Sequence, residues 1–478
     1  MKEEYPEWVL KWKRKGTAIH KIGGNFYLYE IGSIWDKELR RARKVTKGYL
    51  GKITPEGLKE PFYKRNKVTD VKEYGASRFI MDGNEDVIIG LKECFRRWWK
   101  ELFVISAMRM MYRCVLKNVS LQYEDSWISE GIKGARLDSH SIHELLEDVG
   151  RRREEIVRFL KGLGKNQKDV VLIDLTHIFS LSKNINLAWI GYNNDFEFTP
   201  QVNLLFMFSL EEKMPIFYRI LPGNVRDVAS LKMTIEESGI KDAIVIGDKG
   251  FYSKENQRLL EESSLKYILP LKRNSKIIDY RLVKEGDKRK FEGYFKYGER
   301  FIWYYKSKEE DGGVVWVYYD EKGKAEESQD YLGRIETHPE FDYSIRGYYE
   351  NEVKFGTIAL LTNKKELEGK EVYNYYKSRV EIEVLFDTFK NVLQADRSYM
   401  RSNVGLESWM FLNYISLIYY YRIYQKLVMK KLLDRYSVSD VLLHLSKIRR
   451  ARVSGHWMDL EKPKQARMLC EKLGIHIT

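Results

Sequence analysis

The stretch YYKSRVEIEVLFDTFK, residues 375–390, combines aromatic, basic and acidic side chains in a pattern that predicts a helix. An α-helix advances about 100° per residue, so Tyr376, Arg379, Glu383 and Lys390 project within an arc of about 60°. Apolar side chains on the adjoining side can anchor this helix to a core: they are Ile382, Phe386 and Phe389. An i,i+4 pair such as Arg379 and Glu383 is often only surface decoration, so the helix alone does not establish a site.

Two aspartates stand where the sequence predicts the ends of apolar strands. Asp174 lies in VLIDLT and Asp248 lies in IVIGDKGF. In open α/β sheets, ligands bind at the carboxyl ends of the strands. One such aspartate would more simply mark the point where the chain reaches solvent. Two of them, with Gly250 close behind the second, favour a site.

The three carboxylates of Asp174, Asp248 and Glu383 are suited to two Mg²⁺ ions, because Mg²⁺ prefers hard oxygen ligands and keeps several waters. Two such ions, about 3.5–4 Å apart, activate a water or a 3′-hydroxyl and stabilise the leaving oxygen in phosphodiester transfer. The two cations and the phenol on the same helix face suit phosphate oxygens. The sequence therefore predicts metal-dependent chemistry on nucleic acid.

Composition limits the class of protein. A chain of 478 residues predicts two to four domains. Its net charge of +14, with 14% aromatic residues, favours an anionic partner such as nucleic acid or an acidic membrane surface, although mere solubility explains the charge as well. Three cysteines without metal-type spacing predict a reducing cytosol: they are Cys94, Cys114 and Cys470. The most apolar stretch, SWMFLNYISLIYYY, is shorter than the ~20 residues of a membrane span and predicts a core helix.

The fold class predicted is α/β, a mixed sheet with flanking helices. We expect six regions along the chain: a small β-rich N-terminal segment (1–65), a helical DNA-binding region (66–165), the first part of the core (166–275), a β-rich insertion (276–365), the second part of the core with the catalytic helix (366–435), and a basic helical C-terminal region (436–478).

Two basic features before residue 165 allow more than one interpretation. The run LRRARK, residues 39–44, follows a predicted hairpin and suits either DNA contact or a structural cap. Arg151, Arg152 and Arg153 stand between two predicted helices, the first with a capping box of Ser141 and Glu144. A helix-turn-helix DNA reader fits this pattern, and so does a plain helical hairpin with a solvated basic corner.

The spacing Tyr-(2)-Arg-(3)-Glu-(6)-Lys resembles the signature of DDE transposases from bacterial and archaeal insertion sequences, specifically the insertion-sequence-four superfamily. DLTHIFS around Asp174 and DKGF around Asp248 resemble the first and second acidic motifs of that family. ILPGNVRD, residues 220–227, resembles the stretch between them. The resemblance spans roughly residues 165 to 430.

This resemblance implies an RNase H-like catalytic core interrupted by the β-rich insertion. It implies that Asp174 bridges both metals, while Asp248 and Glu383 each hold one. Further residues would then contact DNA. Those expected at phosphates near the cleaved end are Tyr376, Arg379 and Lys390. Trp303 or Trp316 would stabilise a flipped base, although tryptophans in strands usually belong to a core. Lys249, Lys272 and Arg273 follow core strands and would line the DNA channel, or equally lie in solvated loops.

The function implied is cut-and-paste DNA transposition. The protein would bind terminal inverted repeats, nick DNA with Mg²⁺ or Mn²⁺, and join the 3′ end to target DNA. It would act as a dimer on double-stranded DNA in a prokaryotic cytoplasm, associated with the nucleoid and not with a membrane. Two alternatives remain: a non-catalytic DNA-binding repressor derived from a transposase, and an RNase H-fold nuclease without strand transfer.

Overall fold

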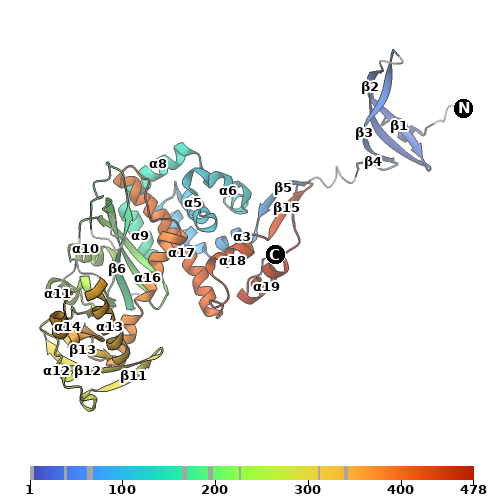
Figure 1. The fold of residues 1–478 in the computed structure, drawn as a ribbon. Helices are drawn as coiled ribbons and strands as arrows, with labels where there is room; N and C mark the ends of the chain where they lie inside the picture. The colour runs from blue at the N-terminus through green and yellow to red at the C-terminus, as the bar shows by residue number, and fades with distance from the viewer. Residues whose placement is uncertain are drawn as a thin grey trace.

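A computed structural model describes residues 5–36, 40–61, 68–163, 170–191, 198–225, 228–310, 313–337 and 343–477. Its centre is a mixed sheet of nine strands with helices packed around it, so the chain is a mixed α/β protein (Figure 1). The predicted stretch 220–227 ends outside the described residues, because residues 226 and 227 are not among them.

The large sheet has the strand order β11-β12-β13-β14-β10-β9-β6-β7-β8. Pairing is parallel between β6 and β9 and between β9 and β10, and antiparallel at the other junctions. Helices α10 and α11 connect the strands around β9. The bounds in this first part are β6 Val170–Phe179, β7 Gln201–Ser209, β8 Met214–Pro222, α10 Val228–Ser238, β9 Ile244–Ile246, the 3-10 turn η2 Lys249–Phe251, α11 Lys254–Glu262 and β10 Lys266–Pro270.

The residues expected to form a separate β-rich insertion extend this same sheet, because β14 pairs with β10. They also form helices α13 and α14, although only strands were expected here. Helix α13 is charged along its whole length and has no buried side chain. The bounds are α12 Arg281–Glu285, η3 Lys288–Lys290, β11 Gly293–Tyr297, β12 Arg300–Glu310, β13 Gly313–Asp320, α13 Glu321–Thr337, α14 Ile345–Asn351, η4 Glu352–Lys354 and β14 Thr357–Thr362.

A helical layer packs beside the sheet, around the long helix α17. Seventeen of its residues are buried, and the apolar stretch SWMFLNYISLIYYY lies within it, as the prediction of a core helix requires. No helix in the described part of the chain has the length and apolarity needed to cross a membrane. The bounds are α3 Gly75–Asp82, α4 Glu85–Cys94, α5 Trp99–Tyr112, η1 Leu116–Asn118, α6 Val119–Asp125, α7 Ile128–Gly131, α8 Ser139–Gly150, α9 Arg153–Leu163, α15 Gly369–Lys377, α16 Val380–Asp387, the π-helical turn η5 Thr388–Val392 and α17 Asn403–Met429.

Arg153 connects this helical layer to the sheet. Its guanidinium donates to Glu237 of α10 and to Glu407 of α17, each at 2.8 Å, and to the carbonyl of Tyr218 in β8. Arg151 and Arg152 instead form exposed i,i+4 pairs along the chain. Of the three adjacent arginines, Arg153 therefore makes an internal contact, whereas Arg151 and Arg152 form the predicted solvated basic corner.

The predicted capping box of Ser141 and Glu144 is wrong. Helix α8 begins three residues earlier than such a cap requires, and its N-cap is Asp138, whose side chain accepts from the Ser141 amide at 2.9 Å. A carboxylate at the N-cap satisfies the same free amide that a serine would. Glu144 pairs instead with Arg97, in the turn between α4 and α5.

Two small sheets complete the fold. The first has the order β1-β2-β3-β4 and a core of its own, covered by α1. The second has the order β16-β15-β5, so residues 68–73 pair with a strand near the C-terminus. The bounds are α1 Glu7–Leu10, β1 Thr17–Ile22, β2 Asn25–Asp36, β3 Arg41–Thr54, β4 Gly57–Lys59, β5 Val68–Glu73, α18 Val438–Leu445, β15 Arg449–Val453, β16 His456–Asp459 and α19 Lys464–Leu473.

Two secondary-structure expectations differ from this fold. The region 436–478, expected to be helical, contains β15 and β16, because its strand partner β5 is far away in sequence and gives no local signal. The stretch LAWIGYNN, expected to be a strand, shows among its described residues one isolated bridge, from Trp189 to Gln201.

Candidate active site

Strand register brings Asp174 and Asp248 to the same level of the sheet. The parallel ladder between β6 and β9 ends with the pair of Leu172 and Ile246. Asp174 and Asp248 each lie two residues beyond that pair, so their carboxylates come from neighbouring strands at the edge where β9 stops. Carboxyl ends of parallel strands are the ordinary place for a ligand site in an open sheet.

The structure corrects the prediction that Asp174 ends its strand. β6 continues to Phe179, paired on its other side with β7, where Asp174 lies opposite Phe206. The chain does not reach solvent at this residue, and the Asp174 side chain is only 14% exposed. An aspartate in the middle of a buried strand requires a partner, because an isolated buried charge is costly.

Arg379 supplies that partner and joins all three predicted acids. Its guanidinium nitrogens lie 2.9 Å from Oδ2 of Asp174 and 2.9 Å from Oδ1 of Asp248. The nearest oxygen of Glu383 lies 3.9 Å from the same guanidinium, on a side chain that is 62% exposed. The three acids therefore converge on one arginine.

The continuous helix predicted for residues 375–390 is wrong, because it breaks between α15 and α16. The Ser378 hydroxyl donates to the carbonyl of Asn374 at 3.0 Å, a contact that bends helices. The amides of Arg379, Glu381 and Ile382 bond three residues back instead of four. The helical turn is therefore tighter at Arg379, and the direction of its side chain differs from that expected for a regular α-helix.

The predicted apolar anchor of this segment is present. Ile382 and Phe389 are fully buried, and the rings of Phe386 and Phe389 pack against Phe206 of β7 at centroid distances of 6.1 and 5.6 Å. Phe206 lies opposite Asp174 in the ladder. The anchor therefore fixes the helix over the strand that carries the first acid.

Burial and charge shift the ionisation of the groups at this site. Burial raises the pKa of Asp174 to about 6, although the Arg379 charge opposes this shift. Burial also raises the pKa of Tyr376, which the Arg379 charge again opposes. Groups that burial and specific charges perturb together are typical of functional sites.

The structure places the remaining predicted residues in different surroundings. Lys249 and Lys272 are exposed at the edge that carries Asp248. Arg273 forms a bidentate ion pair with Glu327 of α13, at 2.7 and 2.8 Å, so it stabilises the sheet extension as it stands. Lys390 is half-buried in the π-helical turn η5.

The two tryptophans proposed for a flipped base also differ. Trp316 is buried at 8% exposure beneath α15, which places it in the core. Trp303 is half-buried, with the ring of Tyr294 at 5.0 Å and the ammonium of Lys288 at 4.9 Å. The Trp316 alternative is therefore removed, whereas contact between Trp303 and DNA remains a prediction.

Lys377 is a partly buried cation, two residues before Arg379, that the sequence pattern did not single out. Burial lowers the pKa of its ammonium; Asp320 opposes this shift, whereas Arg300 and Lys249 add to it. Lys377 lines a cavity together with Asp320 and Arg300, and its ammonium lies 5.3 Å from the centroid of the Tyr373 ring. Its position two residues before Arg379 was the available signal, but it falls outside the Tyr-Arg-Glu-Lys spacing.

The carboxylate oxygens of Asp174, Asp248 and Glu383 are suitable ligands for a divalent cation, but their present arrangement does not form a metal site. Among the described residues, no three acidic, histidine or cysteine side chains are placed to hold a metal ion as they stand. The guanidinium of Arg379 lies between two carboxylates and supplies the positive charge there. Oxygen ligands suit Mg²⁺, provided that Arg379 moves away from them.

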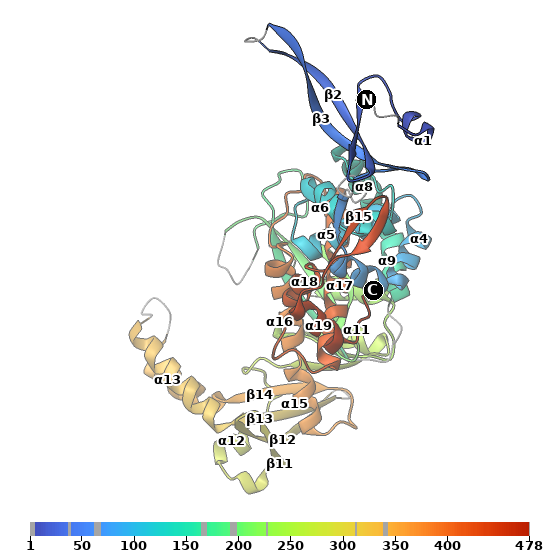
Figure 2. The same cartoon turned by 90° about the vertical axis from the view of Figure 1, so that its right-hand side faces the viewer.

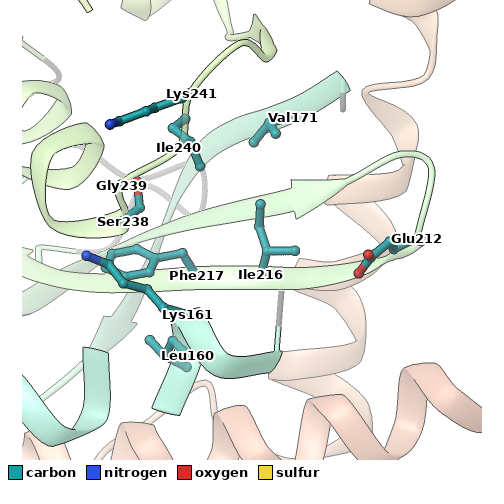
Figure 3. Close-up of a pocket in the computed structure, with 10 residues that line it drawn as sticks. All are labelled: Leu160, Lys161, Val171, Glu212, Ile216, Phe217, Ser238, Gly239, Ile240 and Lys241. Carbon is teal, nitrogen blue, oxygen red and sulfur yellow. The ribbon is translucent and has the colours of Figure 1, made fainter. Parts of the chain in front are cut away.

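A separate cavity lies at the opposite end of the sheet. It has a volume of about 350 Å³ and is lined at the beginning of β6 by Val171 and, before β9, by Ile240 and Lys241 (Figure 3). The acids lie toward the other ends of these parallel strands. The cavity lining mixes apolar and charged side chains and does not include the three acids, so we do not assign the chemistry to it.

A family model described as the transposase DDE domain matches residues 165–419, more than half of the chain. The chain therefore belongs to the DDE transposase family. No curated protein matches it.

Two solved structures resemble the chain distantly. A piggyBac transposase synaptic complex with hairpin DNA shares 13% identity over 73% of this chain and 69% of that chain, with a TM-score of 0.36. A Drosophila P element transposase strand transfer complex shares 13% identity over 70% of this chain and 82% of that chain, with a TM-score of 0.22. At such low TM-scores, the family assignment rests on the domain match.

Proposed function

We propose that this protein catalyses cut-and-paste DNA transposition and belongs to the insertion-sequence-four superfamily of DDE transposases. The observation that carries this proposal is the convergence of Asp174, Asp248 and Glu383 on Arg379 inside the transposase domain. The spacing of Tyr376, Arg379, Glu383 and Lys390 supports the superfamily assignment.

We propose further that the five strands β8-β7-β6-β9-β10 form an RNase H-like core. Three parallel strands continued by two antiparallel strands support this topology, with Asp174 on the central strand β6 and Asp248 two residues beyond the neighbouring strand β9. The strands β11 to β14 then extend the core at its outer edge.

In the proposed reaction, Asp174, Asp248 and Glu383 hold two divalent cations, Mg²⁺ or Mn²⁺. When bound, these ions supply Lewis acidity for hydrolysis and for strand transfer. Arg379, freed from the carboxylates, binds a phosphate oxygen of the DNA end through its forked donors. Tyr376 donates a hydrogen bond beside it, and Lys249 and Lys377 add positive charge to the DNA path.

The partners proposed are double-stranded transposon ends and target DNA. A dimer on DNA follows from the need to hold two ends together during excision and joining. We place this activity in the prokaryotic cytoplasm, at the nucleoid, on the resemblance to bacterial and archaeal insertion-sequence transposases.

The experiment is a cleavage and joining assay with the full chain and plasmid DNA carrying the sequences that flank its gene. Asp174→Asn, Asp248→Asn and Glu383→Gln should each lower the rate of nicking by about three orders of magnitude or more. Glu381→Gln is the matched control, because Glu381 lies on α16 but pairs with Lys213 at 3.3 Å.

The products separate the proposal from its alternatives. Nicked and joined DNA supports a transposase, whereas nicked DNA without joined products indicates a nuclease. DNA binding without any cleavage by the wild type, with either Mg²⁺ or Mn²⁺, indicates a repressor and overturns the proposal.

A further inference from the structure

The N-terminal sheet has two faces of different character. One face packs under α1, where Val9, Leu28 and Ile53 are at most 4% exposed. Phe26 and Ile19 adjoin this small core. Because side chains alternate along a strand, the residues between these positions project from the opposite face.

That opposite face carries a cluster of aromatic rings. Tyr29 lies 5.0 Å from His20 and 5.2 Å from Tyr49, measured between ring centroids, and Tyr27 lies 6.0 Å from Tyr49. Lys52 lies opposite Tyr27 in the ladder between β2 and β3. We call these five residues the tyrosine face; its tyrosines are half-buried and its histidine is exposed.

Strands β2 and β3 continue beyond the sheet as a two-stranded ribbon (Figure 2). β1 pairs with β2 only as far as Glu30, and β4 pairs with β3 only from Lys52 to Thr54. Beyond the Ile31 amide, which donates to the Gly16 carbonyl at 2.8 Å, residues 32–36 and 41–45 pair with each other and with no third described strand. Two bulges near the base increase their twist. We call these two segments the ribbon.

The ribbon is exposed and basic. Arg41, Arg43 and Lys44 are exposed on β3, while Ile34 and Trp35 on β2 are 61% and 63% exposed. In the register, Lys44 and Trp35 lie on the same side as the tyrosines, and Arg41 and Arg43 lie on the other side. A two-stranded ribbon fits the major groove of B-DNA, which is about 12 Å wide.

The charge of the chain is concentrated here. Residues 5–61 contain thirteen lysines and arginines against six acidic residues, a net charge of +7 out of +14 for all 478 residues. Lysine and arginine at a surface bind duplex DNA by displacing its condensed counterions. Such a surface would repel a second copy of the same sheet.

We propose that the ribbon and the tyrosine face together form a binding surface for duplex DNA, with the ribbon in the major groove. Cations on both sides of the ribbon contact the two phosphate strands that border the groove. The exposed Trp35, which lies on the same face as the tyrosines, contacts base edges and thymine methyl groups. This inference takes from the proposed transposase function only that DNA is the partner. It does not depend on the roles of the three acids.

The test measures binding rather than cleavage. Fluorescence anisotropy with a labelled duplex of mixed sequence, the full chain and EDTA compares the wild type with Arg43→Ala/Lys44→Ala. The double variant should bind at least about 10-fold more weakly. The plot of log K against log salt concentration should also become less steep by about two, because each phosphate contact contributes about 0.9 to the magnitude of the slope. Lys13→Ala/Arg14→Ala is the matched control, because it removes two exposed cations from the turn after α1 and should change affinity by less than twofold.

A second variant tests the groove contact. Trp35→Ala removes an exposed side chain without opening a core, so the fold should persist, and duplex binding should weaken without a change in the salt slope. Equal affinities for the wild type, the ribbon variant and its control would overturn the proposal, even if the chain cleaves DNA. Loss of DNA binding by the ribbon variant supports it, even if no variant cleaves DNA.

Discussion

Arg379 holds the candidate site together by joining two carboxylates. The two carboxylates that it joins come from different strands, and one of them is largely buried. Two carboxylates held this close by the fold repel each other, and the positive guanidinium between them offsets this repulsion. In the proposed reaction, the same guanidinium would have to move before divalent cations could bind these carboxylate oxygens.

At the residue scale, Arg379→Ala should therefore strengthen Mg²⁺ binding by the DNA-free protein by about 10-fold or more, because it removes the competing charge. Arg379→Lys should give an intermediate affinity, since a lysine supplies the charge without the fork. Isothermal titration with Mg²⁺ measures both dissociation constants. Addition of Mg²⁺ should also raise the melting temperature of Arg379→Ala more than that of the wild type. An unchanged dissociation constant would show that Arg379 does not compete with the metal.

At the element scale, the close approach of α8 and α17 sets the position of the helical layer beside the sheet. A Cβ added at Gly150, the last residue of α8, would lie 1.9 Å from the carbonyl oxygen of Val404 in α17. A contact with backbone cannot be relieved by a change of rotamer. Glycine is therefore required at this helix crossing.

Gly150→Ala should cost about 1–3 kcal/mol of unfolding free energy or more, because the two helices must separate. Gly162→Ala in α9 is the matched control: no described atom lies within 4 Å of its added Cβ. Alanine there should stabilise the protein by about 0.5–1 kcal/mol through helix propensity. Urea denaturation followed by circular dichroism measures both variants. Equal effects at the two glycines would contradict the packing argument.

At the scale of the whole molecule, distant parts of the chain meet around Glu73. This residue ends β5, pairs with Arg449 of β15 through the backbone, and is 3% exposed. Its carboxylate accepts from the amides of Ala76 and Ser77 at the start of α3. Burial raises its pKa to about 7, while these hydrogen bonds oppose the shift.

Because the folded state holds this proton more tightly than the unfolded state, stability should fall as pH rises from about 4.5 to about 7. The Glu73 contribution to this fall is about 3 kcal/mol over the full range. Glu73→Gln should flatten the dependence, whereas Glu93→Gln, at an exposed position on α4, should leave it unchanged. Urea midpoints measured across this pH range test the prediction. A slope that persists in Glu73→Gln would assign it to another group.

The sequence by itself determined which residues are proposed for the site. The acids, the cations and the phenol could be chosen from residue type and spacing, and the anchoring residues Ile382 and Phe389 from apolar periodicity. These signals are local, because propensity, burial pattern and motif spacing act within a few turns of the chain.

Tertiary structure alone decided how these groups meet. Asp174 lies inside β6, because pairing with β7 continues this strand to Phe179. The helix expected over residues 375–390 is interrupted at Arg379, and the strands of residues 276–365 join the central sheet because β14 pairs with β10. Each of these outcomes depends on a partner far away in sequence, such as β5 for β15. Register and long-range pairing are fixed by which surfaces the folded chain can bury together, and no local pattern contains that information.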